Sequence, residues 1–210
     1  MLNIAVFGSG RGSNFSAILN AISGGSLPGT KVAVVISNNS TAGILEIARA
    51  HAIPAVHLSQ KYYASEGDFA DALLAGLHAY GVELVVLAGY MKHLPASVVA
   101  AYRHRIINIH PALLPEFGGQ GMYGQHVHEA VLAARRTVSG ATVHLVDSEY
   151  DHGAIVLQDR VPVLPGDTAA LLAERVLQVE HRLLPEAIGL FAAGRLSVVD
   201  GKVRIHPEQE

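Results

Sequence analysis

The sequence predicts an α/β protein whose core is an open, mostly parallel, twisted sheet with helices on both faces. Short apolar stretches alternate along the first half of the chain with stretches whose apolar residues recur at helical spacing. The middle apolar stretches are nearly continuous, as in parallel strands that helices cover on both faces. A glycine-rich loop after the first strand, residues 8–14, is a third feature of such Rossmann-like sheets.

The individual elements follow from the same patterns in chain order. Strands and helices alternate in the first half, with strands over 3–7, 31–37, 55–58 and 83–88 and helices over 14–22, 42–51 and 65–79. Further strands are predicted over 105–109, 138–146 and 154–162. Asp167 is expected to cap a long amphipathic helix through Leu183. The segment 196–205 alternates around Asp200-Gly201 and predicts a C-terminal hairpin with a type I′ turn.

Composition limits the kinds of partner and chemistry. With 210 residues and 50% hydrophobic residues, the chain can bury the core of a single domain. The formal charge of −3 and the scattered Lys and Arg residues give no reason to expect a nucleic-acid partner. The chain contains no Cys, so a disulfide framework and a thiolate nucleophile are excluded. No apolar run approaches roughly 18 residues and the N-terminus does not resemble a signal peptide, so we expect a cytoplasmic protein without a membrane segment.

Asn108 and His110 are the first candidates for chemistry. They lie two residues apart at the end of an apolar strand that Pro111 terminates, so both side chains should project to the same face. An amide donor beside a proton carrier suits a reaction in which negative charge develops on a carbonyl oxygen. Taken alone, an Asn-x-His favours a turn cap and a buried core histidine over a catalytic pair.

The glycine-rich loop is a candidate phosphate site. Its glycines let backbone N–H groups approach an anion, and Ser13 or Asn14 is expected to cap the following helix. It is neither a P-loop nor the dinucleotide motif, because Ser13 replaces the third glycine. A glycine-rich first turn is also a common structural device.

Three other segments carry side chains that could bind a ligand. Residues 89–94 place Met91, His93 and Leu94 after a strand, where they could line a crevice or belong to the core. The glycine-rich loop 116–128 ends with His126 and His128, but the sequence offers no third ligand beside them, so no metal is expected. The turn 147–153 contains three acids, and composition does not say which of Asp147, Glu149 and Asp151 faces the site.

Taken together, these motifs resemble a known enzyme family. The run IINIHPALLP at 106–115, the segment 142–146 and the turn 150–153 are similar to the folate-dependent formyltransferases. The resemblance implies a sheet of about seven strands and a catalytic set of Asn108, His110 and Asp151. It also implies transfer of a formyl group from 10-formyltetrahydrofolate to the amine of glycinamide ribonucleotide, with Asp151 holding His110 as imidazolium.

The same resemblance assigns binding residues. It implies that Gly12, Ser13 and Asn14 hold the substrate phosphate, and that Glu180, in the Gln-x-Glu-His run at 178–181, binds the ribose. It implies that the folate is held by Met91, Lys92, His93, Leu94 and Asn108. The single domain would then comprise a phosphate-binding half at 1–100, a folate and catalytic half at 101–195 and the hairpin. Both substrates are small molecules, and the protein is expected to be a monomer or homodimer.

Three positions depart from the family pattern. The loop 116–128 is longer than expected, His152 stands where a glycine is usual, and Glu66 falls where an Arg should meet the folate. Lys61 could replace that Arg.

Three alternative functions are considered. A formyltetrahydrofolate deformylase would use the same catalytic set, but it normally carries an extra N-terminal domain, which a first strand beginning at Asn3 leads us not to expect. A methionyl-tRNA formyltransferase would need a second, basic domain. A non-catalytic phosphosugar-binding module would use only the glycine-rich loop.

Overall fold

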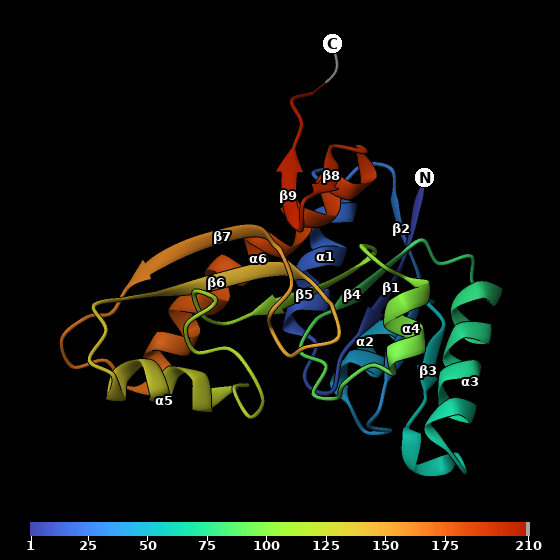
Figure 1. Ribbon diagram of the computed structural model, residues 1–210, viewed down its shortest axis with the longest axis horizontal. Helices are drawn as coiled ribbons and strands as arrows, with labels where there is room; N and C mark the ends of the chain where they lie inside the picture. The colour runs from blue at the N-terminus through green and yellow to red at the C-terminus, as the bar shows by residue number, and fades with distance from the viewer. Residues whose placement is uncertain (209–210) are drawn as a thin grey trace. The chain divides into compact units, whose positions relative to one another are not determined.

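A computed structural model describes residues 1–208 and confirms the predicted fold class. The strands form a seven-stranded sheet in the order β3-β2-β1-β4-β5-β6-β7, and a separate two-stranded sheet is formed by β8 and β9 (Figure 1). The pairs β1–β2, β1–β4 and β2–β3 are parallel, whereas β6 and β7 are antiparallel. The chain divides into two compact units, Met1–Ile107 and a second that begins at Asn108.

The first unit alternates strands and helices, as the sequence predicts. Its strands are β1 (Leu2–Phe7), β2 (Thr30–Ser37), β3 (Ala55–His57) and β4 (Leu84–Leu87), and its helices are α1 (Ser13–Ser23), α2 (Gly43–Ala50), α3 (Glu66–Ala79) and α4 (Ala96–Ala101). Every residue of β4 and the last four of β1 are buried, as expected for strands covered on both faces. Neither α4 nor the 3₁₀ turn Gln60–Tyr62 was predicted, because elements of one or two turns are too short to show a period.

The start of α1 corrects one expectation. The N-cap residue is Gly12, not Ser13 or Asn14, and its φ of 87° lies in the left-handed region. A Cβ on Gly12 would lie 2.9 Å from the Cα of Ile44, so only glycine fits where the loop meets α2. Ser13 therefore begins the helix instead of capping it.

Within residues 1–208, the second unit contains most of β5, four further strands and two helices. β5 (Ile106–His110) crosses the unit boundary, and it is followed by α5 (Gln125–Ala133), β6 (Val138–Leu145), β7 (Ile155–Pro162) and α6 (Ala169–Ala192). Figure 1 shows α6 running along β6 and β7, with which it is in contact. The hairpin of β8 (Leu196–Val199) and β9 (Lys202–Ile205) is confirmed, with positive φ at both Asp200 and Gly201 as a type I′ turn requires.

Both ends of α6 differ from the prediction. Thr168 is the N-cap, and its hydroxyl accepts a hydrogen bond from Leu171 N–H, while Asp167 instead binds Arg175. The helix also continues past Leu183 and contains Pro185. A proline removes one helical hydrogen bond, but the buried face continues beyond it with Ala187, Ile188 and Leu190, and that burial keeps the helix intact.

A buried hydroxyl fixes the loop that follows β5. The hydroxyl of Thr142 on β6 donates to Ala112 O (2.6 Å) and accepts from Leu114 N–H (3.1 Å). The amide of Gln158 on β7 donates to Thr142 Oγ1 (2.9 Å) and to Leu114 O (3.0 Å). Thr142 is fully buried, so these bonds are shielded from water and hold the segment directly after His110.

Thr142→Val should therefore destabilise the protein. The variant keeps the side-chain shape but leaves Ala112 O and Leu114 N–H without that partner, and each buried unsatisfied group costs roughly 1–3 kcal/mol. We expect the free energy of unfolding, measured in urea, to fall by about that amount. Thr41→Val is the matched control, because the Thr41 hydroxyl bonds Asn39 on the exposed surface. Equal stability of the two variants would contradict this role for Thr142.

Candidate active site

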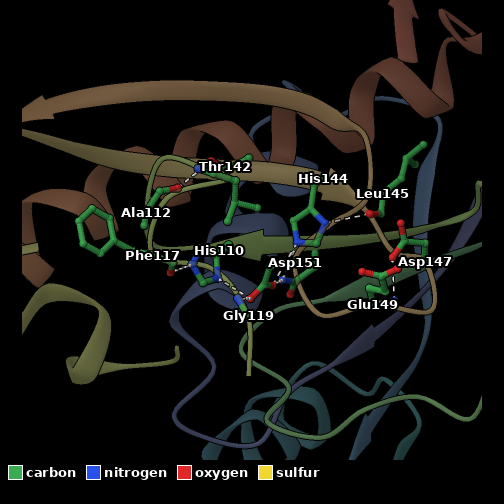
Figure 2. A network of polar contacts seen from close by, with 12 residues as sticks. His110, Ala112, Phe117, Gly119, Thr142, His144, Leu145, Asp147, Glu149 and Asp151 are labelled. Atoms are coloured by element: carbon green, nitrogen blue, oxygen red, sulfur yellow. Dashed lines mark hydrogen bonds and ion pairs between the residues drawn. The ribbon is translucent and has the colours of Figure 1, made fainter. Parts of the chain in front are cut away.

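The structure brings together Asn108, His110 and Asp151. The alternation of β5 places the Asn108 and His110 side chains on one side, as predicted. His110 Nδ1 lies 3.5 Å from Asp151 Oδ2, and Asn108 Nδ2 lies 3.5 Å from Asp151 Oδ1. Figure 2 shows the His110 ring and the Asp151 carboxylate directed toward each other. An amide, an imidazole and a carboxylate therefore meet at the end of β5.

Only one of the three acids in the turn after β6 faces this cluster. Asp151 is 12% exposed, has a left-handed φ of 54°, and contacts His110 and the Gly119 N–H through its carboxylate. Asp147 is 42% exposed and binds Glu149 N–H and the ring of His152. The geometry thus distinguishes the three acids of the turn, which composition alone could not do. His152 contacts Asp147.

His144 on β6 is a further member that the sequence analysis did not assign. Its Nδ1 lies 2.8 Å from Leu145 O, and its Nε2 lies 3.0 Å from Asn108 Nδ2. A carbonyl can only accept, so Nδ1 carries the proton and Nε2 accepts from the Asn108 amide. His144 therefore orients Asn108. The sequence offered one signal for His144, since it lies two residues after Thr142 on a strand that was predicted from the sequence.

The loop after Pro115 supplies two backbone contacts. His110 Nε2 lies 2.8 Å from the carbonyl oxygen of Phe117, and the Gly119 N–H donates to Asp151 Oδ2 at 3.0 Å. The extended loop therefore reaches both ionisable members of the cluster. Backbone groups have no residue-type signature, so sequence reasoning missed these contacts.

Burial sets the charge state of His110. Burial lowers the pKa of His110, the Asp151 carboxylate and the Phe117 carbonyl raise it, His144 lowers it, and the net pKa lies below the ordinary value of 6.5. The expectation that Asp151 keeps this ring charged was wrong, because desolvation of a ring only 3% exposed outweighs the attraction of one carboxylate. His110 is a mainly neutral imidazole at pH 7.

Asp151 is a carboxylate in the same conditions. Burial raises its pKa, but His110 and the Gly119 N–H lower it, and the net pKa lies below the ordinary value of 3.8. The site thus pairs a fixed negative charge with a neutral imidazole, and a proton delivered to this pair can be shared between them.

The predicted phosphate residues lie at the start of α1 in the first unit. Ser13 begins this 11-residue helix, so the N-terminal N–H groups of a helix adjoin the glycine-rich loop. Ser9 ties this loop to its neighbours, since its hydroxyl donates to Asn38 Oδ1 (2.5 Å) and accepts from Met91 N–H (2.8 Å). The loop is therefore linked to the segment predicted to hold the folate.

The predicted folate residues differ in exposure. Met91 is 47% exposed, Lys92 and His93 are also exposed, and Leu94 is only 2% exposed. The Leu94 side chain thus belongs to the core, and only its backbone is available to a ligand. Lys61 lies 4.9 Å from the Tyr62 ring on the surface, and Glu66 is exposed in the first turn of α3.

Glu180 and the two loop histidines occupy different settings in the second unit. Glu180 on α6 is 8% exposed. Burying a carboxylate is costly unless it is paired or hydrogen-bonded, so its burial suggests a specific role. His126 is exposed beside Glu129, whereas His128 is buried on α5. Among residues 1–208, no three His, Cys, Asp or Glu side chains cluster so as to bind a metal. No helix in the same range is long and apolar enough to cross a bilayer.

Comparisons with known proteins identify the family of the chain. The formyl transferase family model matches residues 2–188. The chain is 45% identical over 194 residues to the chloroplastic phosphoribosylglycinamide formyltransferase of Arabidopsis thaliana, covering 92% of this chain and 66% of that protein. It is 37% identical over 200 residues to the phosphoribosylglycinamide formyltransferase of Haemophilus influenzae, covering 95% and 92%. The chain thus spans 66% and 62% of the lengths of the two plant relatives from Arabidopsis thaliana and Vigna unguiculata.

Solved structures give the same result. Glycinamide ribonucleotide transformylase 1 from Symbiobacterium toebii has a TM-score of 0.92 and 44% identity, covering 99% of this chain and 95% of that one. A formyltetrahydrofolate deformylase from Pseudomonas syringae has a TM-score of 0.87 and 25% identity, covering 98% and 66%. With a family model that matches nearly the whole chain and full-length relatives above 30% identity, the chain belongs to the formyl transferase family.

Proposed function

We propose that this protein transfers the formyl group of 10-formyltetrahydrofolate to the primary amine of glycinamide ribonucleotide, a step of purine biosynthesis. The observation that carries the proposal is the cluster of Asn108, His110 and Asp151 at the end of β5. Similarity to the Haemophilus influenzae enzyme over most of both chains supports this choice of substrates. Both substrates are small molecules. A monomer or homodimer that acts in the cytoplasm is part of the proposal.

In this proposal Asp151 and His110 first act as a base. A primary α-amine has a pKa of about 8, so it arrives mostly as ammonium. The carboxylate and the neutral ring together accept one proton, which breaks an N–H bond and leaves a free amine. The negative charge of Asp151 then holds the proton on His110 as imidazolium. The depressed pKa of His110 keeps the ring ready to accept that proton.

The same groups then stabilise charge. The amine nitrogen attacks the formyl carbon, and the carbonyl oxygen becomes negative as the new C–N bond forms. The Asn108 amide, oriented by His144, and the Nδ1–H of the His110 imidazolium donate to that oxygen. The bond between the formyl carbon and the folate nitrogen then breaks as the imidazolium proton passes to that nitrogen, and the new amide nitrogen gives its surplus proton back to the pair of His110 and Asp151. No covalent enzyme intermediate is required.

Binding is assigned to groups outside this cluster. Gly12, Ser13 and Asn14 would hold the substrate phosphate with backbone N–H groups at the start of α1. Glu180 would accept hydrogen bonds from the ribose hydroxyls. The folate would be held by residues 91–94 and Asn108: the exposed Met91, Lys92 and His93 could use side chains, and Leu94 only its backbone. Lys61 could supply the cation that Glu66 cannot.

A deformylase is the second candidate, because the Pseudomonas syringae deformylase shares the fold over 98% of this chain. Purified protein with 10-formyltetrahydrofolate separates the two activities. Tetrahydrofolate release that requires glycinamide ribonucleotide supports the transferase. Release without the amine means water is the acceptor, and no release with either would leave only a binding role.

Changing the acid in the turn tests the catalytic assignment. We expect Asp151→Asn and His110→Ala each to lower kcat by at least ~10²-fold, the scale of losing a general acid–base group or an oxyanion donor. KM for both substrates should change much less. Asp147→Asn is the matched control and should keep near-normal turnover. The reverse pattern, with Asp147→Asn inactive and Asp151→Asn active, would mean that Asp147 is the catalytic acid.

The pH dependence tests the charge state. The acid limb of kcat/KM reports groups of the free enzyme and substrate that must lose a proton, and neutral His110 is one of them. The Asp151 carboxylate raises the pKa of His110, so its removal lowers that pKa. We therefore expect the acid limb of Asp151→Asn to lie at lower pH than that of the wild type. Ionisation of the substrate cancels in this comparison, so a limb that stays in place or moves to higher pH contradicts the model of a coupled pair.

A further inference from the structure

Residues Phe117–Gly119 form a backbone clamp on the catalytic pair. The Phe117 carbonyl accepts from His110 Nε2 at 2.8 Å, and two residues later the Gly119 N–H donates to Asp151 Oδ2 at 3.0 Å. That carboxylate oxygen is the one that faces His110 Nδ1. One short segment therefore contacts both side chains of the pair, and it contacts the carboxylate through a different oxygen from Asn108, which contacts Oδ1.

The conformation of the clamp is specific. Phe117 has a φ of 57°, in the left-handed region that bulky residues rarely adopt, and Gly119 has a φ of 99°. Such conformations persist only where the surrounding contacts fix them. Gly118 lies between them with no room for a side chain, since a Cβ would be 2.6 Å from Leu114 Cδ2 and 3.1 Å from Asp151 Cβ. The sequence Phe-Gly-Gly thus allows the carbonyl and the N–H to point at the pair.

The clamp also determines which ring nitrogen takes part in proton transfer. The Phe117 carbonyl can only accept, so His110 Nε2 must carry a hydrogen in the neutral ring and in the charged ring. Nδ1 is then the nitrogen that gains and loses a proton, and it faces the Asp151 carboxylate. The contact also favours the charged form, because both ring nitrogens donate in imidazolium.

We propose that the backbone of Phe117–Gly119 is a positioning segment. Its Phe117 carbonyl keeps a hydrogen on Nε2 of His110, and its Gly119 N–H holds Asp151, so that Nδ1 accepts and returns the proton of the reaction. This inference rests on the proposed role of His110 and Asp151. The titratable groups that face His110 are Asp151 in the turn, His144 on β6 and His128 on α5. The last two are histidines, so Asp151 is the one acid among them.

Two glycines of the same loop provide a matched test. Gly119 and Gly121 both have positive φ, 99° and 89°, and an added Cβ would meet nothing within 4 Å at either position. Alanine at each site thus carries the same kind of backbone strain and no clash, but only Gly119 belongs to the clamp. We expect Gly119→Ala to lower kcat by about 10-fold or more, since small displacements of catalytic groups have large effects on rate. KM should stay within about 3-fold, because the substrate contacts are untouched.

NMR of the ¹⁵N-labelled protein without substrates gives a second readout. In the wild type and in Gly121→Ala we expect a slowly exchanging Nε2–H signal from His110. In Gly119→Ala this signal should exchange faster and the pKa of His110 should fall, since a loosened Asp151 raises that pKa less. These signals do not depend on activity, so they test the clamp even if the wild type transfers no formyl group.

The outcomes separate cleanly. Loss of kcat with a lowered His110 pKa in Gly119→Ala, and neither change in Gly121→Ala, supports the clamp. Equal behaviour of the two variants in both readouts overturns it. If Gly119→Ala does not fold, Gly119→Asn is compared with Gly121→Asn, because Asn tolerates left-handed backbone better than Ala, and the same two readouts decide. Wild-type kcat and an unchanged Nε2–H signal in Gly119→Asn would equally overturn the proposal.

Discussion

The arrangement of the site depends on one buried carboxylate. Asp151 is 12% exposed, and a carboxylate withdrawn from water must be met by donors and positive charge. Its Oδ1 faces the Asn108 amide, and its Oδ2 faces His110 and the Gly119 N–H. Satisfying this charge places the amide, the imidazole and the loop backbone in one arrangement.

The same burial gives the cluster its chemistry. Burial away from solvent strengthens each electrostatic contact and lowers the pKa of His110, so that the ring is neutral before the substrate binds. The surrounding fold keeps the cluster rigid: β5 supplies two side chains at alternate positions, and Thr142 and Gln158 hold the loop that follows. Left-handed backbone at Phe117 and Asp151 indicates that the site is held against local conformational preference.

The sequence predicted what periodicity and strand alternation control. The strands and helices of the first unit and the pairing of Asn108 with His110 fall in that class. Asp151 was distinguished from Asp147 only by resemblance, because the choice depends on a left-handed residue in the turn. The Phe117 and Gly119 contacts were not predictable, since any residue type offers the same carbonyl and N–H. The sign of the His110 pKa shift was wrong because depth of burial, which decides it, is a property of the folded chain.

The central claim is that Asp151 and His110 act as one unit. A double-mutant cycle on kcat with Asp151→Asn, His110→Ala and the combined variant tests it most directly. Residues that share one proton in one step are not additive, so the combined variant should be about as impaired as the worse single variant. A combined loss equal to the product of the two single losses would show that the carboxylate and the imidazole act independently, and would contradict this account.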